Sequence, residues 1–168
     1  MDEVVTLVAY DPAWPELFAR ERDLLRQALG ETIIAIHHVG STSIPGLRAK
    51  PIIDICVESE VYPPDKAVIE ALAKLGFTPH GEAGVPGRHW FAKGHPRTHH
   101  INWCPVNGAI AQAAIKFRDA LRANPVLAEA YANVKSVSAA KHQIDGLEYN
   151  QDKEPFIRSV LESKSNDE

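Results

Sequence analysis

Apolar residues along this chain of 168 residues recur in two patterns, one typical of strands and one typical of helices. Short apolar runs bounded by glycine, proline or polar residues predict strands, whereas apolar positions three or four residues apart predict helices. The expected strands are 4–8, 33–36, 51–57, 77–82, 88–93 and 98–104. The expected helices are about 11–29, 65–75, 109–123, 124–141 and 150–162.

Capping residues mark the ends of the first two helices. Asp11 followed by Pro12 is typical of a helix start, because aspartate caps the first turn and proline is tolerated within it. Gly30 is expected to end that helix. Asp65 is expected to begin the second helix and Gly76 to end it.

The order of these elements predicts the fold class. A mixed sheet with helices packed on it, followed by a helical C-terminal part, is an α+β arrangement. A chain of 168 residues suits one domain with one core. We therefore expect a single domain over 1–168, with a sheet-bearing core over about 1–105 and C-terminal helices over about 106–162.

Composition and charge limit the classes of function. Hydrophobic residues make up 45% of the chain and charged residues 24%, which is ordinary for a globular protein. The formal net charge of −4 argues against general nucleic-acid binding, and no apolar run approaches membrane-spanning length. No signal peptide opens the sequence, so we expect a cytoplasmic protein. Cys56 and Cys104 lie in apolar runs and are expected to be buried, reduced thiols.

The run from His38 to Ile55 is the most informative part of the chain. A Gly40-Ser41 turn separates two apolar strands, and the second strand carries one carboxylate, Asp54, among isoleucines. An ionised aspartate in such a strand is costly unless it is paired or binds a cation. The turn offers a close backbone approach and a hydroxyl to an anion such as phosphate. Together these features suggest a site for a metal-bound phosphate ester.

The same run resembles the signature of the GrpB family, and the resemblance extends along nearly the whole chain. Further matching motifs are 10–14, 85–88, 97–100 and 117–119. This family is similar to the nucleotidyltransferase superfamily, whose fold is that of DNA polymerase beta. The resemblance implies a nucleotidyltransferase-like fold, a nucleoside triphosphate ligand and Mg²⁺. Nucleotidyltransferases usually carry a second carboxylate two residues after the first, a position that Cys56 occupies here.

Strand alternation places Asp54, Cys56 and Glu58 on one face. Asp54 and Glu58 lie roughly 13 Å apart at about 3.3 Å per residue, so they cannot share one ion. We expect Asp54 to hold the metal ion alone among the carboxylates. An aspartate at position 56 would lie roughly 6–7 Å along the strand and is expected to tighten metal binding at a modest cost in stability. The alternative for Asp54 is a buried ion pair with Lys50 or an arginine.

The strand 98–104 offers two further polar candidates. His100 and Asn102 share its polar face, whereas His99 shares the apolar face and is expected to be a hydrogen-bonded core residue. If the strands are neighbours, His100 and Asn102 complete the metal site with Asp54. The alternative is a cross-strand polar network without a ligand. His38 is expected to hold the Gly40-Ser41 turn through a hydrogen bond.

Basic residues supply candidate phosphate ligands, because an arginine fork matches phosphate oxygens and lysine acts on them as a point charge. Some lie near turns and others in the helical part, at positions that are basic in the family. Tyr131 lies one helical turn before one of these lysines, and the alternative for that pair is aromatic packing beneath the lysine stem. The expected nucleotide-binding residues are Gly40, Ser41, Lys50, Arg88, Arg97, Arg118, Lys135 and Lys153.

We therefore expect a protein that binds a nucleoside triphosphate with Mg²⁺ and transfers a nucleotidyl group to a small-molecule acceptor. In this interpretation Asp54 holds the metal, His100 is a second ligand or the base, and Lys50 and Arg88 neutralise the leaving pyrophosphate. The alternative is a non-catalytic domain that binds a nucleotide or a coenzyme A-related ligand and has lost the metal pair. Cys56 favours that alternative.

Overall fold

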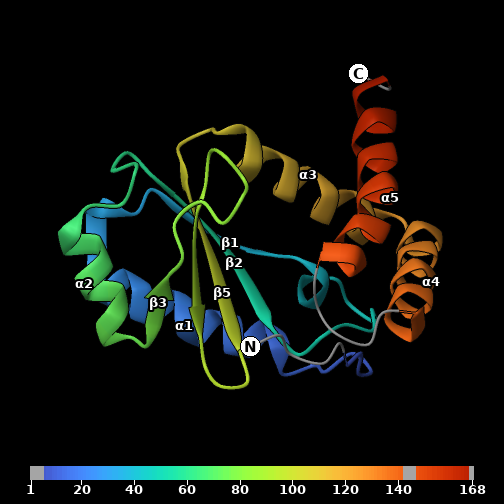
Figure 1. Cartoon of the computed structure of the whole chain (residues 1–168), viewed down its shortest axis with the longest axis horizontal. Helices are drawn as coiled ribbons and strands as arrows, with labels where there is room; N and C mark the ends of the chain where they lie inside the picture. The colour runs from blue at the N-terminus through green and yellow to red at the C-terminus, as the bar shows by residue number, and fades with distance from the viewer. Residues whose placement is uncertain (1–5, 142–146, 167–168) are drawn as a thin grey trace.

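The computed structural model describes residues 6–141 and 147–166, with the side chains of 141, 147–152 and 163–166 left out of that description. It shows a five-stranded sheet with helices packed on both of its faces (Figure 1). The strands are β1 (Ala35–Val39), β2 (Ile53–Ser59), β3 (Phe77–Pro79), β4 (His89–Lys93) and β5 (His99–Pro105). The helices are α1 (Trp14–Leu29), α2 (Lys66–Lys74), α3 (Ala109–Ala123), α4 (Pro125–Lys141) and α5 (Leu147–Asn166). The α+β arrangement expected from the sequence is confirmed.

The order of the strands in the sheet is β1-β2-β5-β4-β3. The central pair, β2 and β5, is parallel, and the other pairs are antiparallel. In that central pair Asp54 lies opposite His100 and Cys56 lies opposite Asn102. Residues that lie opposite each other point to the same face of a sheet, so the polar positions of both strands share one face.

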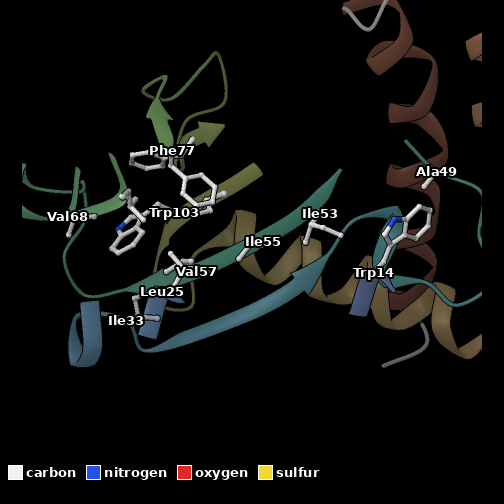
Figure 2. Close-up of a cluster of buried hydrophobic side chains, with 13 residues drawn as sticks. Trp14, Leu25, Ile33, Ala49, Ile53, Ile55, Val57, Val68, Phe77 and Trp103 are labelled. Atoms are coloured by element: carbon white, nitrogen blue, oxygen red, sulfur yellow. The ribbon is translucent and has the colours of Figure 1, made fainter. Parts of the chain in front are cut away.

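The apolar face of the central strands carries the main core (Figure 2). Ile55 and Trp103 are 1% and 0% exposed, and α1 and α2 contribute Leu25 and Leu72 to the same cluster. The Trp103 indole donates its N–H to the backbone carbonyl of Val61 at 2.9 Å, which satisfies its only polar group. Each fully buried large apolar side chain of this kind stabilises the fold by about 1.5–3 kcal/mol.

The opposite face is divided into a covered half and an open half. Helix α3 contacts β1, β2 and β5 and closes a small apolar cluster that contains Val39, Cys56, Cys104 and Ala111. Both cysteines are free and buried, as expected from the sequence. The half that carries Asp54 and His100 lies beyond this cluster and faces the C-terminal helices instead.

Helices α4 and α5 are attached to the chain segment that joins β1 to β2. Ile44 and Leu47 of that segment pack with Leu121, Tyr131 and Ala132 in one buried cluster. The short helical turn η2 (Ser41–Ser43) lies at the start of the same segment. The docking therefore brings the basic residues of α4 and α5 to the Gly40 end of the sheet (Figure 1).

Several boundaries differ from those expected. Helix α1 begins at Trp14, because Asp11 caps the preceding turn instead, accepting a hydrogen bond from the Ala13 N–H at 2.8 Å. The strand expected over 4–8 is reduced to a bridge between Val8 and Ala49, and its residues 4 and 5 lie outside the described residues. Asp65 does cap α2 and accepts from the Val68 N–H at 2.9 Å.

A buried ion pair joins α1 to β4. The Lys93 ammonium donates to both carboxylate oxygens of Glu21, at 2.9 and 3.1 Å. The Glu21 side chain is 5% exposed and that of Lys93 is 25% exposed. His99 lies 3.8 Å from the same carboxylate and contacts the Thr98 hydroxyl at 2.8 Å, so it is hydrogen-bonded as expected, but it is partly exposed and does not belong to the buried core.

Replacing Lys93 by methionine should destabilise the protein by about 2–3 kcal/mol, because the buried Glu21 carboxylate would lose its ammonium partner. The double variant with Glu21→Gln should recover most of that loss. Lys66→Met is a matched control, since Lys66 pairs with Glu70 at 3.8 Å on the exposed surface of α2. Urea denaturation measures the free energy of unfolding of the two single variants and the double variant. Equal losses of that free energy in Lys93→Met and Lys66→Met would contradict the prediction.

Candidate functional site

A cavity of about 980 Å³ lies on the half of the sheet face that α3 leaves uncovered, next to the C-terminal helices α4 and α5. Strands β2, β4 and β5 form its floor, and the Gly40 turn, α4 and α5 line it at one end. The structure brings most of the expected site residues to this cavity. Those that line it are Gly40, Ser41, Lys50, Asp54, Arg88, Arg97, His100, Lys135 and Lys153.

Asp54 and His100 form the centre of the site. They are register partners on the two parallel strands, and the His100 Nδ1 atom lies 3.4 Å from Asp54 Oδ1. The Asp54 side chain is 37% exposed and that of His100 is 15% exposed. The other ring nitrogen of His100, Nε2, is buried and has no hydrogen-bond partner among the described residues.

The surroundings of Asp54 keep its carboxyl ionised. Burial raises the pKa of this group, but the hydrogen bond and charge of His100 oppose it, and so do the charges of Lys50 and Lys153. The net effect lowers the pKa of Asp54 below its usual value. From the sequence, the alternative for Asp54 was an ion pair with Lys50 or an arginine. In the structure its direct partner is His100, and the charges of Lys50 and Lys153 act on it from further away.

The Gly40 turn is shaped by its contact with Asp54. Gly40 has φ +73°, a left-handed value that favours glycine, and a Cβ atom there would overlap the Asp54 carboxylate. His38 holds the turn, as expected, through a 2.9 Å contact between its Nε2 atom and the Thr42 hydroxyl. Burial lowers the pKa of His38 to about 4, so its ring is neutral at physiological pH.

Arg118 is one of two expected site residues that the structure does not bring to the cavity lining. Its guanidinium donates to the backbone carbonyl of His38 at 3.3 Å and pairs with Asp119 at 2.9 Å. Arg122, one helical turn further on, donates to the carbonyl of Ser43 at 2.9 Å. These arginines hold the backbone of the Gly40 turn against α3, behind the cavity.

Asn102 is the second expected site residue that does not line the cavity. Its side-chain oxygen accepts a 2.9 Å hydrogen bond from Arg88, which does line the cavity. This bond occupies the amide oxygen that was expected to bind a metal ion. Asn102 therefore positions Arg88, and burial lowers the pKa of that guanidinium without removing its charge.

The position of the second nucleotidyltransferase carboxylate lies outside the cavity. Cys56 is 1% exposed in the apolar cluster beneath α3. A carboxylate there would be buried among apolar groups, which corrects the expectation of a modest cost and a metal site. The Glu58 carboxylate already has partners: Oε2 lies 2.8 Å from the His37 Nε2 atom, and Oε1 accepts a hydrogen bond from the Asn107 N–H at 2.9 Å.

Within the described part of the chain, no three His, Cys, Asp or Glu side chains are grouped to hold a metal ion.

Lys135 is the most deeply buried cation of the site. It is 2% exposed, donates to the Arg48 backbone carbonyl at 2.6 Å, and lies 5.2 Å from the centre of the Tyr131 ring. Burial lowers its pKa to about 7, and the charges of Lys153 and Lys50 act in the same direction. A bound anion would oppose these effects, so this amine is suited to receive one.

Among the cavity-lining aromatic residues that sequence reasoning missed, His80 and Trp90 are neighbours. Their rings lie 4.6 Å apart. Trp90 shares a strand face with Arg88, so alternation along 88–93 would have placed it beside the cavity once Arg88 was assigned there.

The fold and the cavity together define an α+β protein with a basic, ligand-sized cavity around one ionised carboxylate. The chain belongs to the GrpB family, because the family model described as GrpB protein matches residues 4–163. The UPF0157 protein YqkA of Bacillus subtilis is 39% identical over 160 residues, which cover 95% of this chain. The chain spans about half, 47%, of that relative's length.

One solved structure of the family agrees with this assignment. The crystal structure of conserved protein GrpB from Enterococcus faecalis has a TM-score of 0.83 at 32% identity, covering 95% of this chain and 99% of that one. A structure of Cid1 in complex with the UTP analogue UMPNPP has a TM-score of 0.42 at 16% identity, covering 79% of this chain and 44% of that one. The latter similarity is too low to carry an argument about function. Over the residues that the structure describes, none of the helices has the length and apolar character to cross a membrane.

Replacing Gly40 by alanine should destabilise the protein by more than the left-handed backbone strain of about 1–2 kcal/mol, because the Asp54 carboxylate must also move. Gly46→Ala is the matched control, since Gly46 has φ +80° and no heavy atom lies within 4 Å of its Cβ position. Urea denaturation compares the two variants. Equal losses would show that Asp54 does not press on the turn in solution.

Proposed function

We propose that this chain binds a nucleoside triphosphate in the cavity and acts on it as a nucleotidyltransferase-like protein. The observation that carries the proposal is the charge of the lining. Among the described residues that line the cavity, Asp54 is the one acidic side chain, and it is outnumbered by basic side chains although the whole chain has a net charge of −4. The basic residues are Lys50, Arg88, Arg97, Lys135 and Lys153. A concave surface of one charge attracts ligands of the opposite charge.

The geometry favours a polyphosphate over a single carboxylate or phosphate. The cations come from separate elements: Lys50 from the segment before β2, Arg88 from the residue before β4, Lys135 from α4 and Lys153 from α5. The three lysines are close enough for their charges to interact, whereas Arg88 lies on the β4 side of the cavity, so we expect an extended anion to contact more of these cations than a small one. The Gly40-Ser41 turn adds a hydroxyl and a backbone that a phosphate can approach closely.

The residues fit one magnesium ion, because Mg²⁺ is commonly held by one or two carboxylates together with the phosphates of the substrate. Asp54 would hold it, and His100, whose Nδ1 faces Asp54, would keep that carboxylate in place. The bound ion would supply charge neutralisation at the phosphates. In the transfer, the acceptor oxygen would bond to the α-phosphorus as the bond from that phosphorus to the pyrophosphate oxygen breaks. Lys50, Lys135 and Lys153 would stabilise the charge that develops on the leaving pyrophosphate, and the proton of the acceptor hydroxyl would pass to the Asp54–His100 pair.

A second candidate is binding without catalysis, either of a nucleotide or of a coenzyme A-related ligand. The burial of Cys56 beneath α3 favours it, since the position of the usual second carboxylate is closed to a metal ion. Release of pyrophosphate from ATP with Mg²⁺ or Mn²⁺ distinguishes the two. Binding with no release would support the non-catalytic candidate.

ATP should raise the melting temperature, and Mg²⁺ should increase that effect. Lys135→Met should weaken ATP binding about tenfold or more with or without Mg²⁺, because a hydrogen bond to a charged group is lost. Asp54→Asn should weaken the contribution of Mg²⁺ more than it weakens binding of metal-free ATP. Lys116→Met is the control, since Lys116 is exposed on α3 and does not line the cavity.

Thermal denaturation and calorimetry measure these effects. No stabilisation by any nucleoside triphosphate at millimolar concentration would contradict the proposed function. Equal weakening in Lys116→Met and Lys135→Met would show that the ligand responds to the overall charge and not to this cavity.

Binding should also depend on pH through Lys135, whose pKa of about 7 lies below the usual value. The anion favours the protonated amine, so binding raises that pKa and the protein takes up a proton at pH 8. ATP affinity should therefore be highest at and below pH 7 and fall by up to about tenfold per pH unit above it. Calorimetry in two buffers of different ionisation enthalpy measures the uptake, and Lys135→Met should abolish its protein component. Equal uptake in both proteins would contradict this role.

A further inference from the structure

Trp90 differs from the other tryptophans of the chain. Trp14 and Trp103 are 3% and 0% exposed and belong to the main core, whereas Trp90 is partly exposed and lines the cavity. Its strand, β4, is separated from β2 by β5. At about 4.8 Å between neighbouring strands, Trp90 lies about 10 Å across the sheet from the strand of Asp54.

The register confirms that both side chains lie on one face. Trp90 lies opposite Asn102, Ala92 lies opposite His100, and His100 lies opposite Asp54. Opposite residues share a face, so Asp54, His100 and Ala92 form one row across the floor, and Trp90, two residues from Ala92 on the same strand, lies on that same face. Ala92 and Thr78 also line the cavity, and their small side chains leave space above β4 and β3.

Other planar groups gather around the Trp90 ring. The His80 ring lies 4.6 Å from it with a tilt of 38°, and the His100 ring meets it edge-on at 4.9 Å. The Arg97 guanidinium carbon lies 5.8 Å from the ring centroid. Rings and guanidinium groups of this kind stack on the faces of planar ligands.

Lysines occupy the other end of the cavity. Lys135 of α4 is close enough to Lys50, Lys153 and Asp54 for their charges to act on it. Lys50 comes from the segment before β2, and Lys153 comes from α5. Those C-terminal helices and β3 lie on opposite sides of the central strands (Figure 1). The cavity therefore has a cationic end at the helices and an aromatic end at β4 and β3.

We infer that Trp90, with His80 and Arg97, forms a subsite for the planar base of the nucleotide whose phosphates bind at the lysine end. This inference rests on the proposed function and extends it, because it separates recognition of the base from recognition of the phosphates. Stacking accepts any flat ring, so the subsite selects nucleotides over simple polyphosphates more strongly than it selects one base over another.

Inorganic tripolyphosphate and ATP, both without metal, distinguish the two ends of the cavity. The native protein should bind ATP more tightly than tripolyphosphate in calorimetry. Trp90→Ala should weaken ATP binding about 5- to 100-fold, the usual range for loss of one base-stacking residue. It should leave tripolyphosphate binding within about twofold. Trp90→Phe keeps an aromatic face and should retain most of the ATP affinity.

Fluorescence of the native protein gives a second measurement that requires no variant. ATP should quench the emission of Trp90 more than tripolyphosphate does at equal saturation, because Trp14 and Trp103 are buried away from the ligand. Equal quenching by the two ligands, or an equal loss of affinity for both in Trp90→Ala, would overturn the base subsite. Equal affinity of the native protein for both ligands would overturn it as well and leave the phosphate site standing. Failure of both ligands to bind would overturn the proposed function itself.

Discussion

The charge of Asp54 in the middle of an otherwise apolar strand is the constraint on which the rest of the site depends. Burial disfavours an ionised carboxylate, so the surrounding chain must compensate it. His100 does so at 3.4 Å from the neighbouring strand, and Lys50 and Lys153 do so at longer range. The carboxylate also lies against the backbone at Gly40, where any side chain would overlap it. The turn, the register and the lysines are thus parts of one electrostatic arrangement.

The C-terminal helices bring part of that compensation, the charge of Lys153, from far along the chain. Their docking depends on apolar contacts between the segment after Gly40 and α3, α4 and α5, including Ile44 and Tyr131. Burying the Lys135 amine is costly, and its hydrogen bond to the Arg48 carbonyl offsets part of that cost. The lysines repel one another, since the charges of Lys153 and Lys50 lower the pKa of Lys135. Under the proposed function, a bound anion would relieve this repulsion and stabilise this end of the molecule.

The two halves of one sheet face have different uses because α3 covers only one of them. Beneath α3 the same strands carry Cys56 and Cys104, which pack as small apolar groups. Beyond α3 they carry Asp54 and His100, which face the cavity. A single carboxylate therefore faces the cavity, among several basic side chains. Under the proposed function, protein side chains would neutralise much of the phosphate charge.

The sequence by itself determined most of the elements, the α+β class and the position of Asp54 as a lone charge after the Gly40 turn, because periodicity, capping and a lone charge in an apolar strand are local signals. Alternation also assigned His100 to the polar face. Only the tertiary structure decided which polar positions reach the cavity. Alternation specifies the face of a strand but not its neighbours or the part that a helix covers. For that reason Asn102 and Arg118 support other residues, Cys56 is buried, and Trp90 lines the cavity.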